Sequence, residues 1–566
     1  MKMKMHRQEH PNPQWERADW KNLNGKWEFD FDFGRSARER KLYEQGALSK
    51  EINVPFCPES MLSGIGYTDF MAAVCYRKVF ELSKEEAKKN IVLHFGAVDY
   101  ESFVYINGQL VKTHIGGYSS FEVDITKYVK VGENTIFVIA EDDVRSRQQP
   151  SGKQSGQYYS EGCAYTRTTG IWQTVWLEFL PDTYIRNAKY YSDIHNETLT
   201  IIGNVRGSGE VCAKAFFEGN PMGIARVKAS NSVFSMQIKL SELHLWEPGK
   251  GGLYDLELTF GEDNIKSYFG MRSVHIDGTR FLLNNKPVFQ RFVLDQGYYP
   301  DGIYTAKSDD ELKRDIVLSM ELGFNGARLH QKIFEKRFLY HCDKAGYMVW
   351  CEHANWGMNY TDIIAAENFI GEWLEILERD FNHPSIIGWC PFNETWGYEE
   401  KKLKNTLIEN VYKLTKQFDP TRLCIDTSGF FHTVTDIFDV HDYEQDVDRF
   451  KENCSKITES IENDQIEEMD NWKAVFISEY GGIQWSDNVS NGWGYGNAPK
   501  SKEDFLKRYK GLANAILDNP RITGFCYTQL YDVEQEQNGL YTYEREAKFD
   551  ADSIRTINAR KAAIEQ

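Results

Sequence analysis

Two glutamates stand where apolar stretches of the chain end, and their side chains are suited to acid–base and nucleophilic chemistry. Glu394 closes the segment IIGWCPFNE (386–394), and Glu479 follows the apolar residues of KAVFISEYG (473–481). Two carboxylates that flank one bond can hydrolyse a glycoside, because one protonates the leaving oxygen and the other attacks the anomeric carbon or activates water. Their mutual repulsion is expected to keep one of them protonated near neutral pH. Either glutamate alone would equally suit a cap or an ion pair, so the interpretation depends on the pair.

Eight apolar segments, most of them separated by helical periods, are expected to position these carboxylates. The predicted strands cover residues 288–294, 324–330, 347–352, 386–394, 422–428, 436–443, 473–481 and 522–530. Ser308 and Glu311 form a capping box ahead of one of the helices. Strands that alternate with helices predict a parallel (β/α)8 TIM barrel, whose catalytic residues sit at the carboxyl ends of the strands. The fourth and seventh strands face each other across such a barrel, so Glu394 and Glu479 can share one cavity.

The chain before the barrel alternates apolar and polar residues with the period of β-strands. Residues 1–180 include segments such as GKWEFDFDF (25–33) and predict a jelly-roll-like β-sandwich of the sugar-binding kind. Residues 181–276 carry short strands at regular spacing and predict an immunoglobulin-like β-sandwich. The predicted catalytic barrel then covers residues 277–566. The fold class is therefore multidomain, with two β modules before an α/β module.

Composition limits the classes of function that are open to this chain. The 566 residues carry 66 basic and 84 acidic side chains, a formal net charge of −18. Such a surface repels phosphate backbones and anionic lipids, so neither nucleic acid nor a membrane is an expected partner. The ten cysteines are scattered, and the first residues contain no apolar stretch typical of a signal peptide. We therefore expect a reduced, cytoplasmic protein.

Longer motifs of this chain are similar to those of a known family of enzymes. HPSIIGWCPFNE (383–394) and FISEYGG (476–482) resemble the acid/base and nucleophile motifs of glycoside hydrolase family 2, which contains β-galactosidases, β-glucuronidases and β-mannosidases. Further segments resemble the sugar-binding module and the first part of the barrel of that family: VPFCPESMLSGIGY (54–67), YTRTTGIWQTVWLE (165–178), GFNGARLH (323–330) and RFLYHCDKAGYMVWCE (337–352). The resemblance covers essentially the whole chain.

Carried over residue by residue, this resemblance implies a catalytic set. Glu394 would be the general acid/base and Glu479 the nucleophile. Asn393 would hydrogen-bond the 2-hydroxyl of the sugar, and Tyr443 would hydrogen-bond the nucleophile. Arg328 matches an arginine near the nucleophile, with a buried ion pair as its structural alternative. Family members retain the anomeric configuration, which implies carboxyl groups about 5–5.5 Å apart.

The sequence departs from the family at positions that bear on the sugar. His330 is followed by Gln331 where β-galactosidases have a histidine, and Ala164 stands near the place of their acidic residue from the sugar-binding module. β-Glucuronidases grip the sugar carboxylate with an Asn-x-Lys pair, whereas here the loop reads Glu536-Gln537-Asn538. Because Glu534 and Glu536 would repel a uronate, a neutral sugar is expected.

Several further residues are candidates for contact with that sugar. Asp295 could accept two sugar hydroxyls, with a cap or a turn as its structural alternative. His330, Trp356 and Trp485 are expected near the substrate, with ordinary loop packing as the alternative for both tryptophans. Tyr527 occupies the position of a common active-site tryptophan of the family.

Together these features predict a retaining exo-acting glycoside hydrolase that cleaves a terminal β-linked sugar, most simply in the manner of a β-galactosidase. The same mechanism on α-L-arabinopyranosides or on uronides, as in a β-glucuronidase or β-galacturonidase, is the enzymatic alternative. A catalytically inactive carbohydrate-binding protein is the alternative of another class. No cofactor and no metal ion are predicted. The expected partners are a small glycoside or oligosaccharide and further copies of the same chain in a homo-oligomer.

Overall fold

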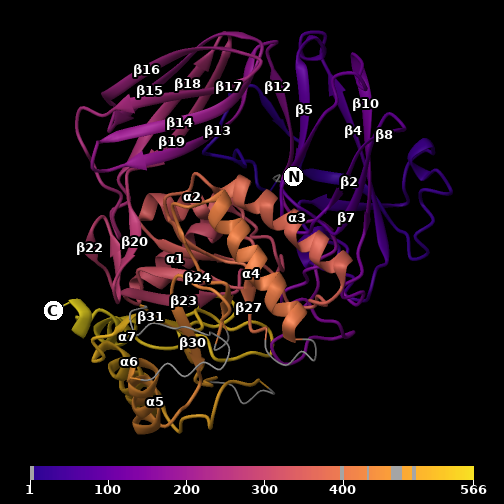
Figure 1. Cartoon of the computed structure of the whole chain (residues 1–566). Coiled ribbons are helices and arrows are strands. Elements are labelled where there is room, and N and C mark those ends of the chain that lie inside the picture. Colours follow the sequence, from indigo (N-terminus) through magenta and orange to yellow (C-terminus); the bar gives the residue numbers. More distant parts are fainter. Residues whose placement is uncertain (1–5, 396–400, 430–431, 460–473, 487–491, 566) are drawn as a thin grey trace.

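The computed structural model of the protein describes residues 6–395, 401–429, 432–459, 474–486 and 492–565, with the remainder drawn in grey (Figure 1). Two β modules, coloured indigo to magenta, lie beside the orange and yellow α/β module (Figure 1). Within the described ranges, no helix is both long enough and apolar enough to cross a bilayer.

The first module consists of two antiparallel sheets that enclose a hydrophobic core. Their strand orders are β1-β12-β5-β9 and β3-β2-β4-β10-β7-β8, with β6 and β11 as a short extra pair. Alternation places Trp27 and Phe29 of one strand in the core while their neighbours face outward. The strands are β1 (Trp20–Asn22), β2 (Gly25–Phe31), β3 (Lys50–Val54), β4 (Ala73–Leu82), β5 (Asn90–Phe95), β6 (Val98–Asp99), β7 (Glu101–Ile106), β8 (Gln109–Ile115), β9 (Phe121–Asp124), β10 (Gly132–Glu141), β11 (Gly170–Ile171) and β12 (Val175–Leu180).

The second module pairs a three-stranded sheet, β13-β14-β17, with a four-stranded sheet, β16-β15-β18-β19. This arrangement is the one expected of an immunoglobulin-like sandwich. The domain boundaries proposed from the sequence stay predictions. The strands are β13 (Tyr184–Asp193), β14 (Thr198–Arg206), β15 (Ser208–Phe217), β16 (Asn220–Ser230), β17 (Val233–Lys239), β18 (Leu253–Phe260) and β19 (Asp263–Gly270), followed by a small separate sheet of β20 (Val274–Asp277), β21 (Arg280–Leu283) and β22 (Lys286–Pro287).

The third module contains eight parallel strands in the order β28-β26-β25-β24-β23-β32-β31-β30. Each predicted barrel segment overlaps one of them, so the prediction of a TIM barrel is confirmed. The strands are β23 (Gln290–Asp295), β24 (Gly326–Leu329), β25 (Met348–Glu352), β26 (Ile386–Cys390), β28 (Leu423–Cys424), β30 (Phe438–Asp442), β31 (Val475–Gly481) and β32 (Ile522–Thr528), and the short β27 (Phe392–Asn393) and β29 (Thr427–Ser428) pair with each other.

Helices cover the outside of the barrel. Ser308 caps the first of them by accepting a hydrogen bond from the backbone N–H of Glu311, as the capping box predicts. The helices are α1 (Asp309–Glu321), α2 (Lys336–Ala345), α3 (Ile363–Asp380), α4 (Lys401–Phe418), α5 (Val447–Glu459), α6 (Lys502–Leu517) and α7 (Ala551–Asn558). The hydrophobic core between helices and strands continues into the first module through Tyr118 and Trp172.

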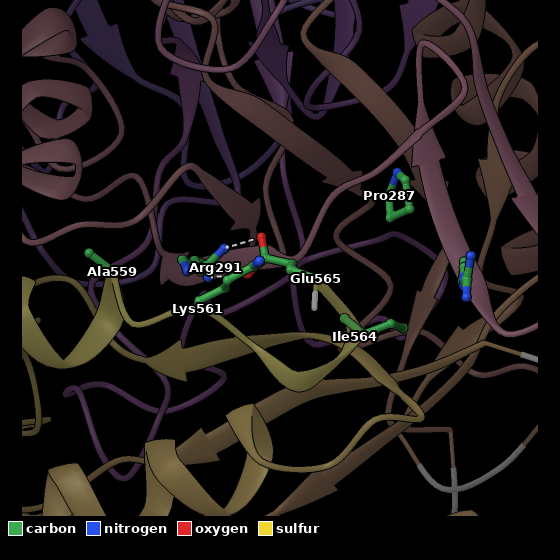
Figure 2. A pocket seen from close by; sticks show the side chains of 7 residues that line it. Pro287, Arg291, Ala559, Lys561, Ile564 and Glu565 are labelled. Atoms are coloured by element: carbon green, nitrogen blue, oxygen red, sulfur yellow. Dashed lines mark hydrogen bonds and ion pairs between the residues drawn. The ribbon is translucent and has the colours of Figure 1, made fainter.

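The two ends of the barrel differ in character. A cavity of about 670 Å³ lies beside Arg291, at the start of β23, where Arg291 pairs with Glu565 at 2.6 Å (Figure 2). Because the strands are parallel, this cavity is at the amino end of the barrel. The predicted catalytic residues lie at the carboxyl end, so this cavity is separate from them.

Candidate active site

Glu394 and Glu479 come together at the carboxyl end of the barrel. Glu394 directly follows β27, and Glu479 lies within β31. One oxygen of each carboxylate and one ring nitrogen of His441 lie within 4.8 Å of one another. Glu394 has a positive φ of 47°, a left-handed conformation that costs free energy in a residue with a side chain. Such strain is typical of residues whose position is fixed by function.

Positive and hydroxyl groups surround the carboxylate of Glu479. Arg328 Nη1 donates a hydrogen bond to Glu479 Oε1 at 2.6 Å, and the hydroxyl of Tyr443 donates to Oε2. Burial alone would raise the pKa of Glu479, but the charges of His441 and Arg328 hold it well below its usual range. Glu479 is therefore an ionised carboxylate at neutral pH, as a nucleophile must be.

Arg328 joins Glu479 to two other residues of the site. Its Nη2 atom donates to the carboxylate of Glu352 and, at 2.6 Å, to Asn393 Oδ1. These bonds fix the amide of Asn393, whose Nδ2 atom is buried and has no partner among the described residues. An unpaired buried donor beside Glu394 is positioned to bind a hydroxyl of a ligand.

His441 is a site residue that the sequence analysis missed. Its Nδ1 atom lies 2.7 Å from Glu394 Oε1, and its Nε2 atom lies 3.5 Å from Glu479 Oε1. Burial lowers the pKa of His441, but the two carboxylates raise it above its ordinary value. The available signal was the period of a strand, because His441 and Tyr443 are two residues apart and face the same side.

His330 and Trp356 contact residues next to Glu394 and Glu479, and their role in sugar binding stays a prediction. His330 Nδ1 is 2.9 Å from Glu352 Oε1 and 4.0 Å from Glu479 Oε1. The indole N–H of Trp356 donates to the carbonyl oxygen of Asn393 at 3.2 Å. Both side chains thus contact residues that adjoin the carboxylate pair.

Two aromatic residues predicted to bind the sugar pack against other parts of the barrel module, and their role in sugar binding stays a prediction. Tyr527 is fully buried and packs its ring 4.8 Å from that of Tyr509 on α6, because alternation along β32 turns it outward. The next residue, Thr528, faces the site and contacts the hydroxyl of Tyr443 at 3.0 Å. Trp485 packs between helix and loop, 6.4 Å from the ring of Phe505.

The carboxylate of Asp295 also accepts hydrogen bonds from other groups of the protein. Its Oδ1 atom accepts hydrogen bonds from the backbone N–H of Gly297 at 2.9 Å and from the hydroxyl of Tyr531 at 2.5 Å. Burial, with the nearby Asp315, raises its pKa to about 6. The alternative of a turn-stabilising role fits Asp295 better than contact with sugar hydroxyls.

The carboxylate pair and His441 are close enough to be compared with a metal centre. Their ligand atoms cluster within 4.8 Å, but Arg328 and Tyr443 already donate hydrogen bonds to the oxygens of Glu479. A cation there would face a guanidinium at hydrogen-bond distance from the same oxygen. We therefore assign no metal ligand, and the expectation of a metal-free site stays a prediction.

Comparison with known proteins identifies two family-level matches. Residues 63–181 match the sugar binding domain of the glycosyl hydrolases family 2, and residues 274–512 match the TIM barrel domain of the same family. A putative beta-glucuronidase of Formosa agariphila is 26% identical over 435 residues, covering 71% of this chain and 50% of that protein. A beta-galactosidase of Thermoanaerobacter pseudethanolicus is 29% identical over 352 residues, covering 57% and 44%. The chain thus spans about half the length of these curated relatives.

Solved structures with the same overall fold include two β-glucuronidases. The Lactobacillus rhamnosus beta-glucuronidase superimposes with a TM-score of 0.81 at 18% identity, covering 96% of this chain and 98% of that one. The Ruminococcus gnavus β-glucuronidase in complex with an N1-substituted uronic isofagomine gives a TM-score of 0.80 with the same identity and coverage. At this identity, the likeness establishes the fold alone.

Proposed function

The chain belongs to glycoside hydrolase family 2, and from that premise we propose that it is an exo-acting glycosidase that cleaves a terminal β-linked sugar with retention of configuration. The observation that carries the proposal is the short distance, within 4.8 Å, between an oxygen of Glu394 and an oxygen of Glu479. Retaining glycosidases hold the two carboxyl groups about 5–5.5 Å apart, whereas inverting enzymes need about 6.5–9.5 Å to admit a water molecule.

The contacts support distinct roles for the two glutamates. Glu479, kept ionised by Arg328 and His441, attacks the anomeric carbon and forms a glycosyl–enzyme bond. Glu394 gives its proton to the departing oxygen, and in the second step it takes a proton from the water that hydrolyses the intermediate. The unpaired Nδ2 of Asn393 donates to the 2-hydroxyl of the sugar as positive charge develops on the ring.

The identity of the sugar is open to two candidates. The sequence favours a neutral galactose-type sugar, with α-L-arabinopyranosides sharing its ring stereochemistry. The argument against uronides depended on repulsion by Glu534 and Glu536, but residues of the first module donate hydrogen bonds to both carboxylates. The backbone N–H of Thr166 donates to Glu534 at 3.1 Å, and the hydroxyl of Tyr165 donates to Glu536. Uronides therefore remain substrates to be tested beside galactosides.

A catalytically inactive carbohydrate-binding protein is the candidate of another class. Such a protein has no need for an ionised nucleophile, a tyrosine and an arginine bonded to it, and a second carboxylate within 4.8 Å. The intact set around Glu479 therefore favours catalysis.

The decisive experiment measures initial rates on nitrophenyl β-galactoside, β-glucoside, β-mannoside, β-xyloside, β-glucuronide, β-galacturonide and α-L-arabinopyranoside. Glu394→Gln and Glu479→Gln are compared with Glu375→Gln, which changes a part-exposed glutamate on α3. We expect one preferred sugar, a loss of several orders of magnitude in both active-site variants, and near-normal rates in the control. Proton NMR of the first product should show the anomer of the substrate. Inversion, or hydrolysis that survives both substitutions, would contradict the proposal.

A further inference from the structure

Lys153 of the first module lies against the barrel beside the proposed active site. The loop that carries it follows β10, and its backbone bonds directly to the segment after β25. The N–H of Ser151 donates to the carbonyl of Trp356 at 2.9 Å, and the N–H of Gly152 donates to that of Ala354 at 3.2 Å. Gly152 has a φ of +56°, and a Cβ there would lie 2.3 Å from the carbonyl oxygen of Gln331. Only glycine therefore permits this close approach.

The side chain of Lys153 is held over the wall of the site. Its ammonium lies 4.2 Å from the centroid of the Trp356 ring, a favourable cation–π distance. Trp356 in turn donates to the carbonyl of Asn393, the residue before Glu394. Electrostatic effects connect Lys153 with the site. Its charge contributes, after burial, to lowering the pKa of His330. Burial lowers the pKa of Lys153 itself, but Cys163 and Glu536, followed by Glu479 and Glu394, raise it above its ordinary value.

Lys153 lacks the acceptors that other buried cations of this protein have. Buried Lys332 has no carboxylate but donates to the backbone carbonyl of Tyr304 at 2.9 Å, whereas the ammonium of Lys153 has no hydrogen bond to any described residue. The side chain is only 6% exposed, yet among the described residues no carboxylate lies within 4.0 Å of its ammonium. By contrast, the buried Lys548 pairs with Asp532 at 2.6 Å, and Arg545 pairs with Asp315 at 3.0 Å. Burying a charge without a partner is costly, so a buried unpaired ammonium in a site indicates an anionic ligand.

We propose that Lys153, supplied by the first module, binds an oxyanion carried by the substrate in the sugar-binding position beside Glu394 and Glu479. This inference rests on the proposed glycosidase function and narrows it to acidic sugars. The shared chemistry is a negatively charged oxygen group, from the carboxylate of a uronic acid or from a sulfate ester. The lysine expected in the loop 534–538 for this task is absent, and Lys153 reaches the site from a different module.

The test compares matched substrates that differ in charge. The 4-nitrophenyl glycosides of β-D-galactose, β-D-galacturonic acid, β-D-glucuronic acid and 6-O-sulfo-β-D-galactose are hydrolysed by the wild type, Lys153→Met and Lys153→Arg. Lys88→Met serves as the control, because Lys88 is an exposed lysine of the same module that pairs with Glu85 at 2.9 Å. Circular dichroism and melting temperature verify that the variants fold.

We expect the wild type to prefer an acidic substrate, and the uronide and sulfate arms then identify the source of the charge. Lys153→Met should lower kcat/KM on that substrate by about 10-fold to 100-fold, the value of a charged hydrogen bond, and Lys153→Arg should recover part of it. The neutral galactoside should change by less than about threefold. Equal losses on neutral and acidic substrates, or a wild type that prefers the neutral sugar, would overturn the inference while leaving the glycosidase intact. No hydrolysis of any substrate would refute the proposed function itself.

Discussion

Glu372 of α3 reaches from the barrel into the first module, and we predict that it makes the protein less stable as the pH rises. Its Oε1 atom accepts hydrogen bonds from the backbone N–H groups of Tyr118 at 2.6 Å and Ser119 at 3.3 Å. Its Oε2 atom is buried without a partner among the described residues, and His353 Nε2 is 3.6 Å away. Burial lowers the pKa of His353 to about 3, so the imidazole is neutral and cannot compensate a carboxylate.

The magnitude follows from the difference between the folded and unfolded states. Burial raises the pKa of Glu372 from 4.5 to about 8, in spite of the two backbone N–H groups that lower it. Between these values the folded protein keeps a proton that the unfolded chain has released, so the free energy of unfolding falls with rising pH. The contribution is complete below about pH 4.5 and is lost as the pH passes about 8. A difference of about 3.5 units corresponds to about 5 kcal/mol, an upper limit for one group.

Urea unfolding of wild type and Glu372→Gln at intervals from pH 5 to pH 9 measures this contribution. Glutamine keeps an oxygen for the two N–H donors but cannot ionise, so the variant should lose less stability over this range. Its curve should be flatter by about 1.4 kcal/mol per pH unit, the value for one proton. Glu375→Gln on the same helix is the control. Burial raises the pKa of Glu375, but His114 brings it below its ordinary value, so this carboxyl group does not take up a proton between pH 5 and pH 9. Removing it should therefore not flatten the curve. Parallel curves for Glu372→Gln and wild type would refute the reasoning.

Three further predictions concern the chemistry of the site. Glu394→Gly should hydrolyse only substrates with good leaving groups, and azide should restore turnover as a β-glycosyl azide; an α-azide would contradict the assigned roles. His441→Gln removes the 2.7 Å contact to Glu394 and should lower kcat/KM by about 10-fold to 100-fold, with the greatest loss for poor leaving groups in a series of aryl glycosides. Tyr443→Phe removes the hydroxyl bonded to Glu479 and should lower kcat by about tenfold or more while KM changes little; an unchanged kcat would show that the bond is dispensable.

The barrel, and the meeting of Glu394 and Glu479 at its carboxyl end, were predictable because local patterns determine them. Apolar segments of strand length and helical periods mark the barrel, and a glutamate after an apolar strand can be placed at its carboxyl end. The register of a strand is harder to predict. Tyr527 was assigned to the site by resemblance, but its neighbour Thr528 contacts Tyr443, and a shift by one residue exchanges the faces of a strand. The same period of two connects His441 with Tyr443, so that residue could have been found.

Lys153 and Glu372 could not have been predicted from local patterns. Both depend on how the first module docks on the barrel, through Ser151 and Gly152 on one side and through Tyr118 and Ser119 on the other. These contacts join segments more than 170 residues apart in the chain, and nothing in the spacing of either segment indicates the other.

The charges of the site give an independent reason to connect that docking with substrate binding. Burial raises the pKa of Glu352, but Arg328 and His330 bring it down to about 2, so Glu352 and Glu479 are both anionic. Arg328 supplies a positive charge against them at hydrogen-bond distance. Lys153 adds a further positive charge, and Glu536, Glu479 and Glu394 raise its pKa, but among the described residues none of these carboxylates lies within 4.0 Å of its ammonium. An anionic group on a ligand would give that ammonium a direct partner, whereas a neutral sugar would leave it with the Trp356 ring as its contact.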